Sequence, residues 1–147
     1  MTRIEDYGLI GDLHTAALVD RAGAIDWLCL PDFDSGACLA ALLGGPDAGQ
    51  WVVAPAAGGD CTRRDYRNDT LVLATEWEND DGHVRLIDFM PPRSTVPSVV
   101  RIVEGVRGRV PMQLDLRLRM DYGHVVPWVR HTHEDHETVL KAVAGPD

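Results

Sequence analysis

The chain has 147 residues, of which 45% are hydrophobic and 25% are charged, a composition typical of one soluble globular domain. Its net charge of -9 repels phosphate backbones, and its 14 Lys and Arg residues form no basic block, so we expect no nucleic-acid partner. No apolar run approaches the roughly 20 residues of a membrane helix, and the acidic start MTRIEDYGLIGD does not resemble a signal peptide, which predicts no membrane association and a cytoplasmic location.

The first half of the chain contains a predicted hairpin, a helix and a strand. Thr15–Val19 and Ala24–Leu30 flank the turn sequence DRAG, which predicts a hairpin. Residues 36–43 are rich in Ala and Leu and lie between Ser35, a residue type that caps helices, and two glycines that end them. We therefore expect one short helix near 36–43, followed by a short strand at Gly49–Pro55.

The second half of the chain contains mainly strand patterns. Leu71–Glu78 and His83–Phe89 flank the turn sequence NDDG and predict a second hairpin. Pro91–Ser98 is a Pro-rich loop that we expect to cross between sheets, and Val99–Val106 predicts the next strand. In residues 112–120, MQLDLRLRM, Met or Leu alternates with polar residues, which predicts a half-buried strand.

The spacing of these elements predicts the fold class. Strands at intervals of about ten residues, separated by turn sequences, indicate an all-β fold, an antiparallel β-sandwich formed by residues 1–147 as a single domain. The last pattern, Thr138–Val143, begins another strand with no closing element after it. We therefore expect this chain to hold an incomplete sandwich and the natural protein to continue.

A histidine-rich stretch near the end of the chain suggests a metal site. His131–His136 (HTHEDH) fits the HxHxDH signature of metallo-β-lactamase-like hydrolases, in which His and Asp residues gather zinc ions. The candidate ligands are His131, His133, Asp135 and His136. Only 11 residues follow, and they contain no further histidine to complete a zinc site. The favoured interpretation is therefore a polar hairpin tip without a metal or other cofactor, and a zinc hydrolase is the alternative.

Acidic residues supply a second chemical pattern. Glycoside hydrolysis uses one carboxylic acid to protonate the leaving oxygen and one carboxylate to activate water or attack. Asp26, Asp32 and Asp34 gather around Trp27 and Phe33 in a segment that runs from a predicted buried strand into a loop. Loops of this kind often present functional side chains. The loop is therefore a candidate for ligand contact, and local structural work such as helix capping is the other interpretation.

Two other sets of side chains favour structural roles. Glu76 and Glu78 alternate with apolar neighbours, so we expect them on the solvent-facing side of a hairpin. The four tryptophans each lie in a predicted strand, where packing in the core is expected: Trp27, Trp51, Trp77 and Trp128. Trp27 is the exception that we expect, because it lies beside the acidic loop.

Long stretches of the chain resemble one enzyme family. The segments IEDYGLIGDLHTAALVDRAGAIDWLCLPDFDSGACLAALLG, VRLIDFMPPR and VVRIVEGVRGRVPMQLDLRLRMDYG resemble the N-terminal region of bacterial glycoside hydrolase family 15 proteins, the trehalase-like and glucoamylase-like enzymes. The resemblance extends from Ile4 to Val129. It implies a supersandwich-like β-domain that precedes an (α/α)6 barrel in the same polypeptide, and the barrel carries both catalytic glutamates. This chain then contains no catalytic residue and is expected to be inactive alone.

The resemblance also implies a substrate and a role for the acidic loop. The parent enzyme would hydrolyse an α-glucoside, with trehalose the expected substrate, by an inverting mechanism. The loop Leu30–Ser35 would border its sugar pocket, with Trp27, Asp32, Phe33 and Asp34 in contact. Asp32 occupies a position where the resemblance implies a basic residue.

Partners and alternatives follow from the same interpretation. The expected partners are the barrel, the α-glucoside and, through exposed strand edges, a second copy of the chain. The main alternative is a free-standing β-sandwich module that binds carbohydrate or another protein. A zinc hydrolase that uses His131–His136 is the less favoured one.

Overall fold

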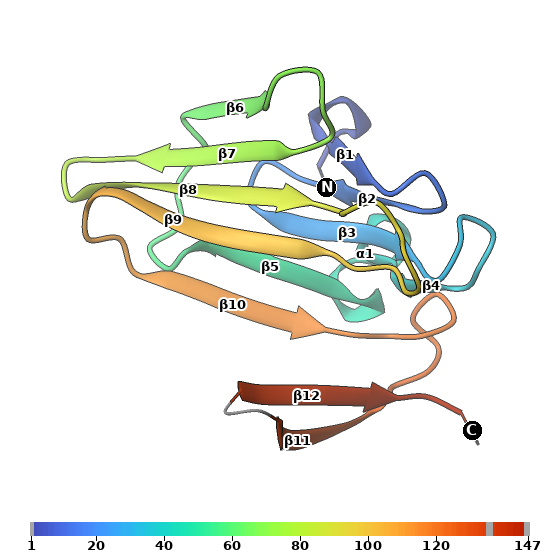
Figure 1. The fold of residues 1–147 in the computed structure, drawn as a ribbon. Helices are drawn as coiled ribbons and strands as arrows, with labels where there is room; N and C mark the ends of the chain where they lie inside the picture. Colours follow the sequence, from blue (N-terminus) through green and yellow to red (C-terminus); the bar gives the residue numbers. More distant parts are fainter. Residues whose placement is uncertain (1, 135–136, 146–147) are drawn as a thin grey trace.

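The computed structural model describes residues 2–134 and 137–145, and it shows two antiparallel sheets that face each other (Figure 1). The first sheet has the strand order β1-β2-β3-β5-β10, with β4 also paired to β3, and the second has the order β6-β7-β8-β9. A separate hairpin, β11-β12, follows. The prediction of an all-β antiparallel sandwich is therefore confirmed.

The strands of the first sheet are β1 (Gly8–Gly11), β2 (Ala16–Val19), β3 (Ala24–Cys29), β4 (Ala37–Leu39), β5 (Gln50–Pro55) and β10 (Met112–Arg117). Those of the second sheet are β6 (Arg63–Tyr66), β7 (Leu73–Glu78), β8 (Gly82–Phe89) and β9 (Val100–Gly108). The hairpin consists of β11 (Trp128–Glu134) and β12 (Glu137–Val143). The helical segments are α1 (Ala41–Gly44) and the 3-10 turns η1 (Ile4–Asp6) and η2 (Pro46–Ala48).

The short helix is present, but it begins later than the sequence suggested. Residues Ala37–Leu39 form β4, and only Ala41–Gly44 are α-helical. The Ser35 hydroxyl does not cap this helix, because it accepts a hydrogen bond from the Asp32 amide at 3.1 Å. The side chains of β4 are all buried in the sheet. Burial therefore outweighs the helical preference of Ala and Leu.

The Pro-rich loop does not cross between the sheets. It joins β8 to β9, which are neighbouring antiparallel strands of the second sheet, so the expectation of a crossing is wrong. The chain passes from one sheet to the other between β5 and β6 and again between β9 and β10. The loop instead reaches one end of the sandwich, where it meets two loops of the first sheet (Figure 1).

Among the described residues, the core between the sheets is mainly apolar and contains a buried ion pair. Ile10, Ile25 and Leu86 have no exposed side-chain surface. Arg101 on β9 donates to both carboxylate oxygens of Asp88 on β8, at 2.8 and 3.1 Å, and both side chains are almost completely buried. The same guanidinium donates to the carbonyl oxygens of Trp51 and Gly23 in the first sheet. This arginine therefore links the two sheets.

Candidate functional site

Three loops meet at one end of the sandwich, on the right in Figure 1. They are the β1-β2 turn, the β3-β4 loop and the β8-β9 loop, and hydrogen bonds join all three. We call this group, formed by residues 12–14, 31–34 and Arg93, the loop cluster. It contains the acidic loop that the sequence singled out, so it is the candidate functional site.

Arg93 is the residue that connects the three loops. Its Nε donates to Asp12 Oδ2 at 2.9 Å, and its Nη1 donates to Asp32 Oδ1 at 2.8 Å. Its Nη2 donates to the Pro31 carbonyl oxygen. The Arg93 side chain is only 12% exposed although it comes from a surface loop. One guanidinium therefore fixes the β1-β2 turn and the β3-β4 loop relative to each other.

Asp12 is the buried acceptor in this arrangement. Its Oδ1 accepts hydrogen bonds from the amides of His14 at 3.0 Å and Thr15 at 2.9 Å, in addition to the bond from Arg93 to Oδ2. Burial raises the pKa of this carboxyl, but the hydrogen bonds from Arg93 and the two amides outweigh burial and hold that pKa below its ordinary value. Asp12 is therefore an ionised structural acceptor, and it is not suited to act as a general acid.

The loop cluster presents two apolar side chains to solvent. Leu13 is 90% exposed and has a φ of +75°, a conformation that is uncommon for a residue with a Cβ atom. Phe33 is 62% exposed, and its amide donates to the His14 carbonyl oxygen at 3.0 Å. Strained backbone and exposed apolar side chains are both more frequent at contact sites than elsewhere. The cluster therefore presents an aliphatic and an aromatic side chain on loops that hydrogen bonds hold together.

The predicted site residues lie in two places. Asp32, Phe33 and Asp34 belong to the loop cluster, and Asp32 is held by Arg93. Trp27 lies on β3, half-buried, with its ring 6.0 Å from the ring of Tyr122 at an angle of 44°. It packs with an apolar group on the sheet, Cys29, Ala37 and Ala40.

Asp26, which the sequence grouped with this loop, is tied to other strands. Its carboxylate accepts hydrogen bonds from the Tyr7 hydroxyl at 2.6 Å and from the side-chain Nε2 of Gln50 at 2.7 Å. Burial, with the neighbouring Asp26 carboxylate, raises the pKa of Tyr7 far above its ordinary range, so Tyr7 stays a hydrogen-bond donor. Asp26 therefore joins the amino terminus to β5 and has a structural role in this chain.

The sequence analysis missed Asp12 and Arg93. Asp12 precedes a turn and reads as an ordinary turn residue, and Arg93 is a lone basic residue in a Pro-rich stretch. The hydrogen bond between them joins residues that lie 81 positions apart in the chain. One signal was available: Asp32 stands where the family resemblance implied a basic residue, and the structure places the basic group opposite it, on Arg93.

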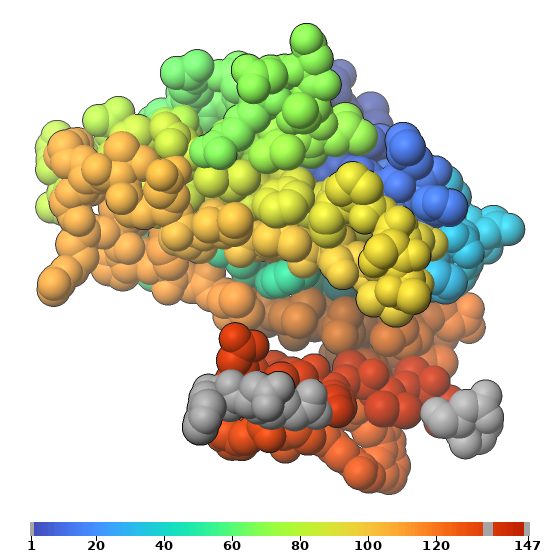
Figure 2. All heavy atoms as spheres, viewed as in Figure 1, coloured from blue at the N-terminus to red at the C-terminus, as the bar shows by residue number. Residues whose placement is uncertain are grey.

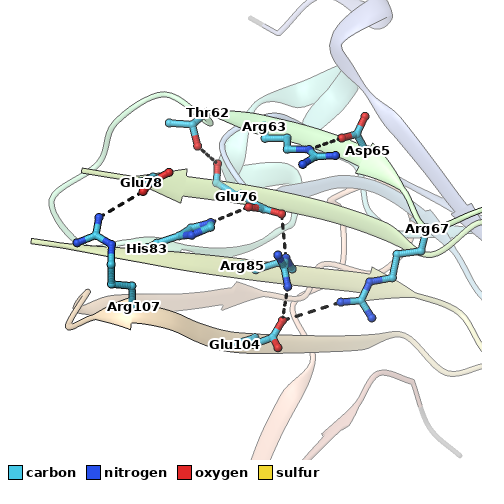
Figure 3. Close-up of polar contacts among 10 residues, drawn as sticks. All are labelled: Thr62, Arg63, Asp65, Arg67, Glu76, Glu78, His83, Arg85, Glu104 and Arg107. Carbon is cyan, nitrogen blue, oxygen red and sulfur yellow. Dashed lines mark hydrogen bonds and ion pairs between the residues drawn. The ribbon is translucent and has the colours of Figure 1, made fainter. Parts of the chain in front are cut away.

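A second polar group covers the outer face of the second sheet (Figure 3). The Glu76 carboxylate accepts from His83 at 2.6 Å and from Arg85 at 2.9 Å, and Arg85 also donates to Glu104 at 2.8 Å. Burial raises the pKa of Glu76, but the hydrogen bonds from Arg85 and His83 outweigh burial, so that pKa lies below its ordinary value. We call these four residues the charged ladder. Its opposite charges are paired, which favours a structural role.

Another carboxylate lies in a polar pocket of about 510 Å³ near the amino terminus. Burial raises the pKa of Asp20 in this pocket, while the Ala24 amide, which donates to its Oδ1 at 2.8 Å, acts in the opposite direction. This bond closes the turn between β2 and β3. Asp20 therefore has a structural role in the β2-β3 hairpin, as Asp12 has in the β1-β2 turn.

The histidine stretch lies in the separate hairpin. His131 and His133 are exposed and lie two residues apart on β11, so they share a face of that strand. Asp135 and His136, the other candidate ligands, lie outside the described residues. Within residues 2–134 and 137–145, no group of three or more His, Cys, Asp or Glu side chains is arranged to hold a metal ion.

The chain is similar to a known domain family and to part of several curated trehalases. Residues 1–146 match the family model described as "Trehalase-like, N-terminal". The chain is 34% identical over 131 residues to the trehalase of Thermoplasma volcanium, a match that covers 85% of this chain and 21% of the relative. It is 30% identical over 120 residues to trehalase 2 of Sulfolobus acidocaldarius, covering 82% of this chain and 19% of the relative.

A mycobacterial relative extends the match along the chain. The trehalase of Mycolicibacterium smegmatis is 26% identical over 164 residues, a match that covers 98% of this chain and 24% of the relative. The chain therefore spans about a fifth of the length of the curated relatives it matches. No solved structure gives a significant match. Among the described residues, no helix is both long enough and apolar enough to span a membrane.

Proposed function

Because the chain belongs to the trehalase-like N-terminal domain family, we propose that it is the N-terminal domain of an α-glucoside hydrolase of glycoside hydrolase family 15. The expected substrate is trehalose, and the catalytic carboxyl groups lie in a separate (α/α)6 barrel of the same cytoplasmic polypeptide. The observation that carries the proposal is the match over residues 1–146, combined with coverage of only about a fifth of each trehalase relative.

The chemistry of the proposed reaction sets what this domain has to supply. An inverting hydrolase protonates the bridging oxygen with one carboxylic acid while a second carboxylate activates water on the opposite face of the sugar. Asp12 is held ionised and Asp32 is paired with Arg93, so neither is free for the acid role. The domain therefore supports the barrel and borders its sugar pocket instead of performing the chemistry.

We assign the border of the pocket to the loop cluster. Phe33 offers an aromatic face that matches the C–H face of a pyranose ring. Leu13 lies on the β1-β2 turn, where the His14 carbonyl oxygen accepts a hydrogen bond from the Phe33 backbone amide. Asp34 is exposed on the same loop and is available to accept hydrogen bonds from sugar hydroxyls. Trp27 supports the loop from β3 through its packing with Cys29 and Ala37. Arg93 positions the loop, because it holds both Asp32 and the Pro31 carbonyl.

The test uses the complete protein that the gene encodes. We expect it to hydrolyse trehalose to one β-glucose and one α-glucose per turnover, as inversion at one anomeric carbon requires, and proton NMR of the fresh product measures this ratio. Phe33→Ala and Arg93→Lys should each raise the KM for trehalose by about tenfold, because the first removes a sugar contact and the second removes the planar fork. Arg63→Lys, on the outer face of the second sheet, is the control and should leave KM unchanged.

Absence of trehalose hydrolysis by the complete protein would contradict the proposed activity. Hydrolysis with an unchanged KM in both variants would contradict the role of the loop cluster alone. The two parts of the proposal are therefore tested separately.

One observation favours the second candidate function, a free-standing carbohydrate-binding module. Trp128 was expected in the core, but it is 77% exposed and lines a groove of about 610 Å³ with Val126 and Val143. An exposed indole of this kind can stack on a sugar ring. Calorimetric titration of the 147-residue chain with trehalose and with maltose decides between the two. We expect no saturable heat, whereas saturable binding that Trp128→Ala abolishes would favour the module.

A further inference from the structure

We propose that the side of the sandwich between β9 and β10 is an interface that a β-strand from the rest of the enzyme completes. We call this region, formed by β9, β10 and the adjacent face of the β11-β12 hairpin, the open side. The inference rests on the proposed function, since it takes the occupant from the part of a trehalase-length polypeptide that this chain does not cover.

The open side exposes apolar side chains that point toward the interior of the sandwich. Leu114 pairs with Val53, which is 4% exposed, and Val103 pairs with Leu86, which is completely buried. Side chains of directly paired residues lie on the same face of a sheet. Leu114 and Val103 therefore face inward, yet they are 68% and 45% exposed. Among residues 2–134 and 137–145, no element covers the interior at this side.

The backbone at the open side is also unpaired. Among the described residues, β9 pairs only with β8 and β10 pairs only with β5, so each is an edge strand of its sheet. An edge strand presents free N–H and C=O groups in the spacing that another strand matches. In Figure 1, β9 and β10 are the end strands of their two sheets on the side toward the β11-β12 hairpin. A strand can therefore extend either sheet here and cover the apolar side chains at once.

A groove continues this surface toward the hairpin. It has a volume of about 500 Å³, and its apolar lining comes from the β10 end and from the hairpin: Leu116, Leu118, Val126, Val129, Leu140 and Ala142. Figure 2 shows the space between the hairpin and the rest of the molecule. A two-stranded hairpin is only marginally stable without further packing. A strand in the groove would give the hairpin an apolar surface to pack against.

The occupant that the observations favour is a further segment of the same enzyme. The chain covers only 21% and 19% of its first two trehalase relatives, so most of an enzyme of that length lies outside the matched stretch. A second copy is less suitable, because each copy carries a net charge of -9 and two copies repel each other. The open side needs both hydrogen-bond partners for its backbone and a cover for its apolar side chains. An extended segment supplies both, so it is favoured over a helix.

The test compares one substitution in two proteins. Leu114→Lys is made in the 147-residue chain and in the complete protein that the gene encodes, and Leu43→Lys serves as the control because Leu43 is 69% exposed, like Leu114 at 68%. Thermal unfolding gives Tm for each. In the chain, both substitutions should shift Tm by less than about 1 °C. In the complete protein, Leu114→Lys should lower the Tm of this domain by at least about 4 °C, because it buries an unpaired charge.

Each remaining outcome overturns the inference. Equally small shifts in both proteins, including the case in which the gene encodes residues 1–147 alone, would show that nothing covers Leu114. Light scattering that finds the chain to be a dimer, converted to a monomer by Leu114→Lys, would assign the open side to a second copy.

Trehalose hydrolysis is measured in parallel and separates the two proposals. An inactive complete protein with the expected Tm pattern would contradict the proposed function and leave the interface standing. An active complete protein without the expected Tm pattern would contradict the interface and leave the proposed function standing.

Discussion

Strands β8 and β10 have similar sequence patterns and very different surroundings. In β8 the inward side chains Val84, Leu86 and Asp88 are at most 2% exposed, because the first sheet covers them. In β10 the inward side chain of Leu114 is 68% exposed. The prediction that β10 is half-buried is therefore wrong for this chain. Alternation identifies the apolar face of a strand, but another part of the molecule has to supply what covers it.

The largest expected effect comes from the covered half of the sandwich. Asp88→Ala should lower the free energy of unfolding by about 3–5 kcal/mol, because it leaves the Arg101 guanidinium buried without a counter-ion. Asp115→Ala on β10 is the control: Asp115 is paired with Arg117 at 2.9 Å, but its side chain is 51% exposed. Asp115→Ala should lower the free energy of unfolding by less than about 1 kcal/mol. Urea denaturation of the three proteins measures both values.

A double substitution tests the reason for this effect. Asp88→Leu combined with Arg101→Met removes both charges, so it should lose less stability than Asp88→Ala, although the Trp51 and Gly23 carbonyl oxygens also lose their Arg101 donor. Similar losses for Asp88→Ala and Asp115→Ala would mean that the buried pair is not what distinguishes the two halves.

The second prediction compares two leucines directly. Leu86→Ala should lower the free energy of unfolding of the chain by about 2–5 kcal/mol, because a completely buried side chain leaves a cavity. Leu114→Ala should cost less than about 0.5 kcal/mol, since its side chain is already in water. Urea denaturation again gives both values. A large loss for Leu114→Ala in the 147-residue chain would indicate that the open side is covered in solution.

The same comparison explains which strands the sequence could predict. The β2-β3 and β7-β8 hairpins have alternating apolar residues around turn sequences, and both were predicted. Strand β6, with the sequence RRDY, was missed because it has no apolar alternation. It is held by Arg64, which donates to the carbonyl oxygens of Asp6 and Val19. Contacts between distant segments of this kind leave no periodic pattern in the sequence.

The candidate site divides in a similar way. The β3-β4 loop was predicted to present side chains, and Phe33 and Asp34 are exposed there. Its position depends on Arg93, which lies 61 residues from Asp32 in the chain. A single sequence shows that a loop is polar and short, but it does not show which distant cation holds it. The loop was therefore predictable, whereas the hydrogen bonds from Arg93 that hold it in place were not.

The smallest expected effect comes from the charged ladder, which is covered on one side only. Glu76→Gln should lower the free energy of unfolding by about 1–2 kcal/mol at pH 7, because a carboxylate that is only 13% exposed loses charge-assisted hydrogen bonds from Arg85 and His83. Added salt should change this little, since partly buried pairs are screened less than exposed ones. Glu78→Gln is the control, since Glu78 is 53% exposed and its contact with Arg107 is longer, at 3.3 Å. It should cost less than Glu76→Gln.

The pH dependence of this effect has a definite sign. Since the hydrogen bonds from Arg85 and His83 hold the pKa of Glu76 below its ordinary value, the folded state binds a proton less readily than the unfolded state. The stabilisation is therefore complete above about pH 4.3, the ordinary value for Glu, and is lost as pH falls through the lower folded-state pKa. The difference between wild type and Glu76→Gln should shrink over that acidic range, as urea denaturation at several pH values measures. A difference that grows on acidification would mean that the Glu76 carboxyl is destabilised in the folded protein, and the ladder would then be a site of strain that the rest of the sandwich tolerates.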